Sequence, residues 1–281
     1  MTENSSVLEI AVIEGGRTDN GPEPAVTDPR AAVHPSAEIG PDCSIGPFAV
    51  VGPHVSLGSG CEVHAHAVIM GPTTLGDENV IHSFACIGGP PQDLRYQGER
   101  TELIVGNNNV FREHVTVNRG TSHGGGFTKI GNNNLLMAYC HVAHDCHIGN
   151  RVVMANHATI AGHTAVGHHA VFGGMVAVGT FLRIGESAML AAGAMVEREV
   201  PPFCIVAGDR ASLRAINRVG LDRRNFNPEA RKQIRAIFRA IKEKGRPLDA
   251  IVAQFSKLDM LSPEAKRMLC FIEEVKRGLT R

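Results

Sequence analysis

Large apolar residues recur at every sixth position along most of this chain. The series runs from Val33 to Ile87, resumes from Val105 to Val117, and is unbroken from Ile130 to Val196. A period of six is not helical, because the residues that share one face of a helix lie three or four positions apart. The pattern predicts short strands separated by turns, repeated so that equivalent positions stack on one another.

Three such strands in each coil predict a triangular parallel β-helix that repeats about every 18 residues, with about 4.8 Å between coils. The large residue and a small residue four places later are both expected to face inward. Cysteines often fill this small position, which favours packing over metal binding or nucleophilic catalysis for Cys43, Cys61, Cys140 and Cys146. The seven cysteines are odd in number and include no CxxC pair, so we expect no disulfide framework.

Two interruptions and a change near residue 200 divide the chain. The repeat breaks at 88–104 and 118–129, which are rich in glycine and polar residues, and such insertions in a solenoid commonly carry function. We predict three regions, which are a loose extension over 1–30, the β-helix over 31–200 and a small helical domain over 201–281.

The last of these regions shows helix-capping signals and a positive charge. Asn227 precedes Pro228, and Ser262 precedes Pro263, as at the start of many helices. The region holds 18 Lys and Arg against 9 Asp and Glu, whereas the preceding part holds 10 against 19. This asymmetry is consistent with an acidic partner or phosphates at the tail, or equally with a solvated helix face.

Composition excludes some classes of function. The formal net charge is zero, so the chain as a whole gives no case for a nucleic-acid partner. Its start lacks the basic segment and apolar core of a signal peptide, and no apolar run approaches the roughly 20 residues that span a bilayer. We therefore expect a cytoplasmic protein without a membrane span.

Candidate chemistry is concentrated in the stretch HVAHDCHIGN, residues 141–150. Val142 and Cys146 are expected to face inward, which leaves the histidines and Asp145 on or near the outside. One hypothesis is a zinc site, since several histidines can bind one ion. A second is a general base, an imidazole that takes a proton from a hydroxyl while a neighbouring carboxylate fixes its tautomer. A third interpretation is ordinary surface histidines.

One coil beyond His144, the repeat predicts that Gly162 stacks upon it. A glycine lets a substrate approach the backbone, and its N–H can donate to a developing oxyanion. His163 follows directly in the sequence. This arrangement favours the general-base hypothesis over the other two.

Several longer motifs carry a family resemblance from about residue 33 to the C-terminus. They are IGPFAVVGPHVSLG, QDLRYQGE, NRGTSHGGGFTKIG, NNLLMAYCHVAHDCHIGNR, AGHTAV, GGMVAV, VPPFCIVAGD and GLDRRNF. The chain resembles the UDP-N-acetylglucosamine O-acyltransferases, a family of hexapeptide-repeat acyltransferases. The resemblance implies an all-β left-handed parallel β-helix followed by a small α-helical domain. It also implies transfer of an (R)-3-hydroxyacyl chain from acyl carrier protein to the 3-hydroxyl of UDP-N-acetylglucosamine, the first step of lipid A synthesis.

The same resemblance implies a homotrimer with clefts between subunits, no metal, no other cofactor, and acyl carrier protein as the partner that brings the acyl donor on its phosphopantetheine. It also assigns roles to residues by their position in the matching motifs. His144 matches the general base, Asp145 its supporting carboxylate and Gly162 the oxyanion donor. The matches for substrate contacts are Asp93, Arg95, His141, His163, Asn217, Arg223 and Arg224. Met189 and Ala192 match the positions that measure acyl-chain length.

The sequence departs from the family pattern around the expected acceptor pocket. Gly179 and Thr180 stand where the family has His-Gln, Val219 where it has glutamate, and Asn118 where it has histidine. Two other functions therefore stay open at this point. One is a related acyltransferase acting on a modified acceptor such as a 3-amino sugar nucleotide, and the other is a non-catalytic β-helix scaffold.

Overall fold

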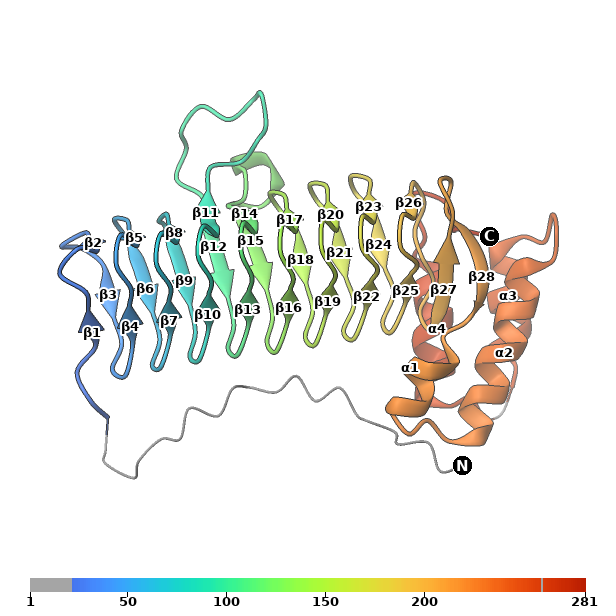
Figure 1. Ribbon diagram of the computed structural model, residues 1–281. Coiled ribbons are helices and arrows are strands. Elements are labelled where there is room, and N and C mark those ends of the chain that lie inside the picture. The colour runs from blue at the N-terminus through green and yellow to red at the C-terminus, as the bar shows by residue number, and fades with distance from the viewer. Residues whose placement is uncertain (1–21, 259) are drawn as a thin grey trace.

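The computed structural model describes residues 22–258 and 260–281, which form a triangular parallel β-helix with four α-helices packed at one end (Figure 1). The β-helix is left-handed, as predicted. Its three faces are parallel sheets, here called A, B and C, and successive strands along the chain pass from A to B to C.

Up to β26, each sheet takes every third strand in parallel, and β27 and β28 then both extend sheet A, with β28 antiparallel to β27. Sheet A contains β1 (Val26–Thr27), β4 (Ser44–Ile45), β7 (Glu62–Val63), β10 (Val80–Ile81), β13 (Val110–Phe111), β16 (Leu135–Leu136), β19 (Val153–Met154), β22 (Val171–Phe172), β25 (Met189–Leu190), β27 (Cys204–Ala207) and β28 (Ser212–Ile216). Sheet B contains β2 (Ala32–Val33), β5 (Val50–Val51), β8 (Val68–Ile69), β11 (Cys86–Gly89), β14 (Thr116–Asn118), β17 (His141–Val142), β20 (Thr159–Ile160), β23 (Ala177–Val178) and β26 (Met195–Val196). Sheet C contains β3 (Glu38–Ile39), β6 (Val55–Leu57), β9 (Thr73–Leu75), β12 (Glu102–Val105), β15 (Phe127–Ile130), β18 (His147–Ile148), β21 (Ala165–Val166) and β24 (Arg183–Ile184).

The register between coils accounts for the period of the sequence. Most paired residues lie 18 positions apart, as Val142 and Ile160 do, so identical positions stack. The inward positions fill a continuous core of buried aliphatic residues. The small positions, including the four cysteines, are also buried, which confirms their packing role. Burial raises the pKa of the Cys61, Cys140 and Cys146 thiols to about 11 or 12, so they stay protonated and unreactive at neutral pH.

The edges of the prism are the turns between sheets, named here the A–B, B–C and C–A edges. On the C–A edge, three buried asparagines form a ladder inside the prism. The Asn79 side-chain oxygen accepts from the Asn109 backbone N–H at 3.0 Å and amide at 2.9 Å, and Asn109 receives the same pair of bonds from Asn134. This ladder crosses both of the places where the sequence repeat is interrupted.

The A–B edge carries a stack of exposed rings. Phe48, His66, Phe84, His114, Tyr139 and His157 stack in that order with centroids 4.7 to 5.2 Å apart. Each of these residues has a positive φ near 60°, which is uncommon for bulky side chains. Because the turn repeats with every coil, the rings lie at the coil spacing, and their stacking offsets some of the backbone cost.

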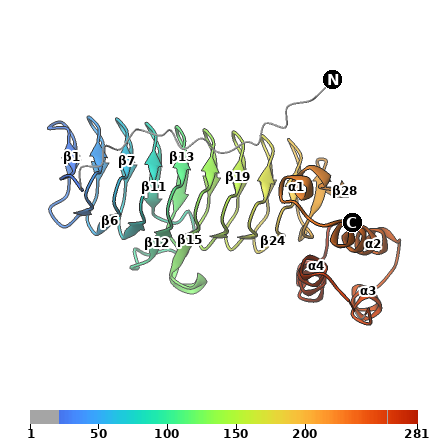
Figure 2. The same ribbon diagram turned by 90° about the horizontal axis from the view of Figure 1, so that it is seen from below.

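Both insertions leave the prism at the B–C edge. The first runs between β11 and β12 and the second between β14 and β15, which includes the short 3₁₀ helix η1 (Ser122–Gly124). The flanking strands extend into the predicted interruptions, so the loops themselves are 90–101 and 119–126. Figure 2 shows the second insertion and helices α3 and α4 protruding on the same side of the β-helix.

The helical region packs against the last coil. Helix α1 spans Arg218–Arg223, α2 Pro228–Lys242, α3 Leu248–Phe255 and α4 Pro263–Glu273. The predicted caps are confirmed, because the Asn227 side chain accepts from the Ala230 N–H at 2.7 Å and Ser262 accepts from the Ala265 N–H at 3.1 Å. None of the helices formed by the described residues is long and apolar enough to cross a bilayer.

The outer regions differ in detail from the predicted division of the chain. Strand β27 pairs in parallel with β25, so the β-helix continues beyond residue 200. At the other end, residues 1–21 lie outside the described residues, but β1 falls within the predicted loose extension and pairs with β4. The residue of β1 that pairs with the inward Ile45 is Thr27, so the six-residue series of large apolar residues does not extend to this strand.

Candidate active site

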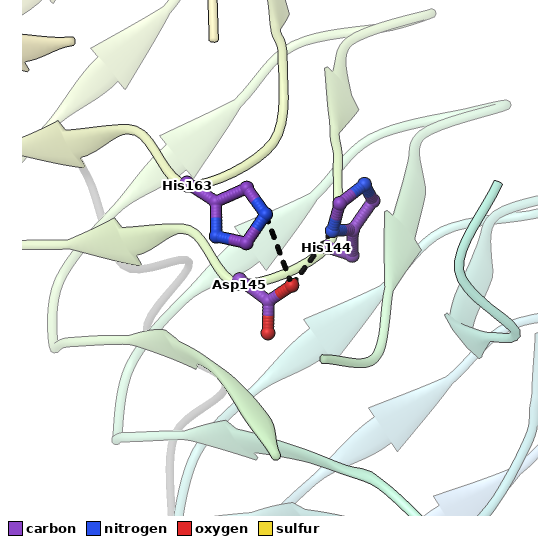
Figure 3. A group of neighbouring side chains, drawn as sticks. All are labelled: His144, Asp145 and His163. Carbon is purple, nitrogen blue, oxygen red and sulfur yellow. Dashed lines mark hydrogen bonds and ion pairs between the residues drawn. The ribbon is translucent and has the colours of Figure 1, made fainter. Parts of the chain in front are cut away.

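His144 and Asp145 lie in the B–C turn after β17, and Figure 3 shows them together with His163 from the next coil. The His144 Nδ1 is 2.7 Å from the Asp145 Oδ2. The His163 Nε2 lies 3.7 Å from that same oxygen, beyond hydrogen-bond range. The His163 Nε2 is buried and has no hydrogen-bond partner among the described residues.

Asp145 was expected on or near the outside, but its side chain is only 1 % exposed. The second insertion covers it, and Thr121 donates to both carboxylate oxygens, from its N–H at 2.8 Å and from its hydroxyl at 2.7 Å. Burial alone would raise the pKa of this carboxyl, but the hydrogen bonds from His144 and Thr121 outweigh it and hold the pKa below its usual range. The group is therefore a carboxylate at neutral pH.

The carboxylate determines the tautomer of His144. An ionised carboxylate only accepts hydrogen bonds, so the His144 Nδ1 carries the proton that lies between the two groups. The neutral ring then has its lone pair on Nε2, directed away from Asp145. This is the arrangement that a general base requires.

Gly162 stacks beside the His144 ring, as the repeat predicted. A Cβ on Gly162 would lie 2.7 Å from the His144 Cε1, so any side chain here would displace the imidazole. The Gly162 N–H has no hydrogen-bond partner within the described part of the chain. It is available to an oxygen atom bound next to the imidazole.

Other histidines around the pair are held in the neutral form. Burial lowers the pKa of His163 below its ordinary value, and the nearby Asp145 carboxylate only partly opposes this. Burial also lowers the pKa of His141, whose Nδ1 is 2.7 Å from the Thr116 hydroxyl. The His163 ring stacks on the Phe181 ring with centroids 4.3 Å apart. The Arg277 guanidinium lies 5.0 Å from the centre of the same Phe181 ring.

The first insertion reaches the same edge. Asp93 pairs with Arg95 through two side-chain hydrogen bonds of 2.9 and 3.2 Å, and its carboxylate lies 3.2 Å from His123 of the second insertion. The bonds from Arg95 hold the pKa of Asp93 well below its usual range. His123 in turn lies 6.2 Å from the His163 ring, centroid to centroid. The two insertions thus form a polar wall beside His144.

The remaining predicted residues lie elsewhere. Asn217 caps α1 and donates to the Ser187 carbonyl at 2.9 Å, and Arg224 donates to the Ser187 hydroxyl at 2.8 Å and pairs with Glu186. These contacts place them at the C–A edge. Arg223 ends α1, Met189 lies on sheet A, and Ala192 lies in the following A–B turn. All of these positions border sheet A, which in a triangular prism is the face opposite the B–C edge.

His144, Asp145 and His163 also meet the geometric requirement for a metal ion, since one ligand atom from each lies within 4.8 Å of the others. The donor set fits poorly, however. The Asp145 Oδ2 already accepts from Thr121 and His144 at 2.7 Å each, so a metal bound to this oxygen would have to displace one of these bonds.

Comparisons with known proteins identify the family of this chain. Residues 199–280 match the family model described as Udp N-acetylglucosamine O-acyltransferase, Domain 2, and residues 127–162 match the bacterial transferase hexapeptide model. Residues 27–121 match a model described as the GMPPB C-terminal domain. An acyl-[acyl-carrier-protein]–UDP-N-acetylglucosamine O-acyltransferase of Stenotrophomonas maltophilia is 44% identical over 265 residues, 94% of this chain and 100% of the relative.

This chain belongs to the UDP-N-acetylglucosamine O-acyltransferase family. A Xylella fastidiosa member is 42% identical over 90% of this chain and 97% of its own length. Among solved structures, the Moraxella catarrhalis UDP-N-acetylglucosamine O-acyltransferase superposes with a TM-score of 0.88 at 34% identity, covering 91% of this chain and 99% of the other. The Arabidopsis UDP-N-acetylglucosamine acyltransferase gives 0.79 at 32% identity, covering 91% and 100%. The family resemblance and acyltransferase class predicted from the motifs are confirmed.

The sequence analysis did not identify three residues that the structure places at this site. Thr121, His123 and Phe181 had no assigned role, although the first two lie in the NRGTSHGGGFTK motif. Insertion residues have no place in the repeat, so their position over Asp145 was not readable from spacing. Phe181 lies 18 residues after His163, and stacking arithmetic applied once more would have found it.

Proposed function

We propose that this chain transfers an (R)-3-hydroxyacyl group from acyl carrier protein to the 3-hydroxyl of UDP-N-acetylglucosamine, as the first step of lipid A synthesis in the cytoplasm. One observation carries the proposal. A buried carboxylate fixes His144 as a base, and Gly162, whose N–H has no partner among the described residues, lies beside the same ring.

His144 would begin the reaction as the general base. Its Nε2 accepts the proton of the sugar 3-hydroxyl while that oxygen attacks the thioester carbonyl carbon. Asp145 stabilises the imidazolium that forms, because a buried anion 2.7 Å from Nδ1 favours the protonated ring.

The tetrahedral intermediate then needs a donor for its oxyanion and a proton for its leaving group. The Gly162 N–H supplies the hydrogen bond to the oxyanion. When the intermediate collapses, the carbon–sulfur bond breaks and His144 returns its proton to the departing phosphopantetheine thiolate. The products are the sugar ester and the free thiol, and the scheme requires no metal ion or further cofactor.

Substrate contacts divide between two sides of the prism. Asp93, Arg95, His141 and His163 line the B–C edge and offer hydrogen bonds to the sugar. Guanidinium groups of the kind found at Arg223 and Arg224 suit the two phosphates of the nucleotide, and Asn217 lies beside them. Because these last residues border sheet A, a single chain does not bring both sets to one substrate.

A second copy of the chain resolves this separation if its sheet A faces the B–C edge of the first. Such a contact joins unlike surfaces, and rotation about a three-fold axis closes it into a homotrimer. The outer row of sheet A supports the same contact, because it is aliphatic along six consecutive coils and partly exposed: Val80, Val110, Leu135, Val153, Val171 and Met189. Met189 and Ala192 would then border the acyl chain of the neighbouring site.

Acyl carrier protein is expected to dock on the basic surface of α2. The side chains of Arg235 and Arg239 are exposed there and make no ion pair or hydrogen bond among the described residues. Arg231 is less suited, since it pairs with Asp222 and donates to the Phe226 carbonyl. Reversing both charges by Arg235→Glu with Arg239→Glu should raise the KM for the acyl donor and leave that for the sugar nucleotide unchanged.

The direct test is an acyl-transfer assay with purified protein, a series of (R)-3-hydroxyacyl carrier proteins and two acceptors, UDP-N-acetylglucosamine and its 3-amino analogue. An ester at the sugar 3-oxygen, seen by mass spectrometry and alkaline lability, supports the proposal. Gly179 and Val219 replace polar residues of the family pattern near the expected acceptor pocket. The value of kcat/KM is therefore compared between UDP-N-acetylglucosamine and its 3-amino analogue. A preference for the amine with a stable amide product would reassign the acceptor, and no transfer to either would refute the function.

The proposed trimer has its own test. Chains carrying His144→Ala and chains carrying Arg223→Ala are each expected to be defective, for different halves of the site. Co-expressed, they should form mixed trimers in which some clefts combine an intact His144 with an intact Arg223. Activity above that of both parents supports a shared site, whereas the mean of the two parents would show that each chain is self-sufficient.

A further inference from the structure

The Asp145 carboxylate lies between two histidines, and the second insertion decides which of them it serves. Its Oδ2 is 2.7 Å from the His144 Nδ1 and 3.7 Å from the His163 Nε2. The His163 nitrogen is buried and lacks a partner among the described residues, so a small rotation of the carboxylate would satisfy it. Such a rotation would also release the Nδ1 of His144.

Thr121 opposes that rotation. Its N–H donates to Oδ1 at 2.8 Å and its hydroxyl donates to Oδ2 at 2.7 Å, so both carboxylate oxygens are held by one residue. On the other side, the Asp145 N–H donates to the Thr128 hydroxyl at 2.8 Å. Thr121 and Thr128 are both fully buried, which protects these bonds from competing water.

The loop around Thr121 is itself fixed. The Thr121 carbonyl accepts from the Gly124 N–H at 3.1 Å and from the Gly126 N–H at 2.9 Å, and these two bonds close the turn. A Cβ on Gly124 would lie 2.1 to 2.4 Å from the carboxylate atoms of Asp145. The turn therefore approaches the carboxylate as closely as a backbone without a side chain allows.

We propose that Thr121 is a positioning residue that commits the Asp145 carboxylate to His144 and withholds it from His163. Resting on the function proposed above, this assigns the second insertion a specific task, which is to choose the catalytic histidine of the pair. The Thr121 side chain donates to Asp145 and not to either histidine ring. It acts only through the orientation of Asp145.

The test compares Thr121→Val, which removes the hydroxyl at nearly constant shape, with Thr121→Ser, which keeps it. Thr101→Val is the matched control, because Thr101 is also buried and its hydroxyl has no partner among the described residues. A hydrogen bond to a charged group is removed only in Thr121→Val, so its kcat should fall on the order of 10-fold or more, with the acceptor KM nearly unchanged. Thr121→Ser and Thr101→Val should both stay near wild type.

A second readout does not depend on turnover. Nitrogen-15 NMR of histidine-labelled protein reports which ring nitrogen of His144 carries the proton. The wild type should show the Nδ1–H tautomer, and Thr121→Val should show a mixture, with a new hydrogen bond at the His163 Nε2. If Thr121→Val does not fold, Thr121→Ala removes the same hydroxyl with less crowding.

Equal losses in Thr121→Val and Thr121→Ser would overturn the proposal, because the hydroxyl would then not be the operative group. So would an unchanged tautomer together with an unchanged kcat. His144→Ala is measured in parallel to separate the two claims. If that variant is inactive while Thr121→Val is normal, only the role of Thr121 fails, and if it remains active, the base assignment itself fails.

Discussion

Histidines occupy equivalent turns on all three edges of this prism, yet only the B–C edge assembles the candidate site. On the A–B edge, His66, His114 and His157 alternate with three other aromatic rings in an exposed stack. On the B–C edge, His163 has the same positive φ but lies beside a buried carboxylate. The six-residue repeat places the histidines of both edges at the same position of the turn.

The two edges differ because both insertions lie at the B–C edge. Both insertions emerge at the B–C edge, and the second covers Asp145 so that its charge is buried and accepts two hydrogen bonds from Thr121. The A–B edge has no insertion among the described residues, and its rings contact one another and solvent. On the B–C edge the insertions therefore add lateral contacts to the axial stacking that the A–B edge has alone.

The largest expected effect separates the two edges by activity. His144→Ala should lower kcat at least about 100-fold, as expected for the loss of a general base. His157→Ala on the A–B edge should leave kcat near wild type. The comparison fails if turnover survives in the first variant, or falls equally in both, while thermal unfolding shows that both are folded.

The next effect concerns the buried charge and its pH dependence. Because the pKa of Asp145 is lowered in the folded state, its contribution to the free energy of unfolding is present above the unfolded value of about 3.9 and disappears as pH falls through the folded value. Asp145→Asn should therefore be less stable than wild type at pH 7, by about 1–3 kcal/mol for a lost charged hydrogen-bond network, and the gap should narrow below about pH 4. Denaturant unfolding at several pH values measures this. A gap that is constant from pH 7 to pH 3 would mean that the charge contributes nothing.

A smaller effect distinguishes two phenylalanines in similar stacks. Phe84 on the A–B edge stacks between two histidines at 5.1 and 5.2 Å, and Phe181 on the B–C edge stacks on His163 at 4.3 Å. Each replacement by alanine should reduce the free energy of unfolding by about 0.5–1.5 kcal/mol or more from lost ring stacking. Only Phe181→Ala should also raise the acceptor KM, because it frees the cleft histidine. A raised KM in Phe84→Ala would show that the A–B edge is not simply structural.

The smallest expected effect is that of chelators. The two bonds already made to the Asp145 Oδ2 leave a metal no free position there, so dialysis against EDTA should not change kcat. Elemental analysis is the companion measurement. A stoichiometric zinc ion whose removal abolishes activity would restore the metal hypothesis for His144, Asp145 and His163.

Much of the fold was predictable from the sequence, because every coil has the same packing requirement in its interior. An inward large residue and a small one four places later are required at each turn of the prism, so the pattern survives to Val196. Helices α2 and α4 were visible through their Asn-Pro and Ser-Pro caps. Helix α3 begins at Leu248 after Pro247, which offers no side-chain cap, and α1 spans only Arg218–Arg223, so neither left a comparable signal.

The site was predictable only where the repeat reaches it. Adding one coil to His144 located Gly162, and the structure confirms their contact. The burial of Asp145 was not foreseen, since it depends on the path of the loop at 119–126 and not on any period. The placement of Asn217 and Arg224 on the opposite side of the prism likewise depends on how α1 returns to the last coil, which no local pattern encodes.

The asparagine ladder on the C–A edge has a consequence for how such an enzyme changes over time. Asn79, Asn109 and Asn134 join the coils on either side of both insertions through the interior, so the register of the solenoid does not depend on the loops outside. The first loop can therefore be lengthened, shortened or replaced while the scaffold keeps its register, whereas the second is constrained by the bonds from Thr121 to Asp145. New acceptors are then within reach of loop variation alone.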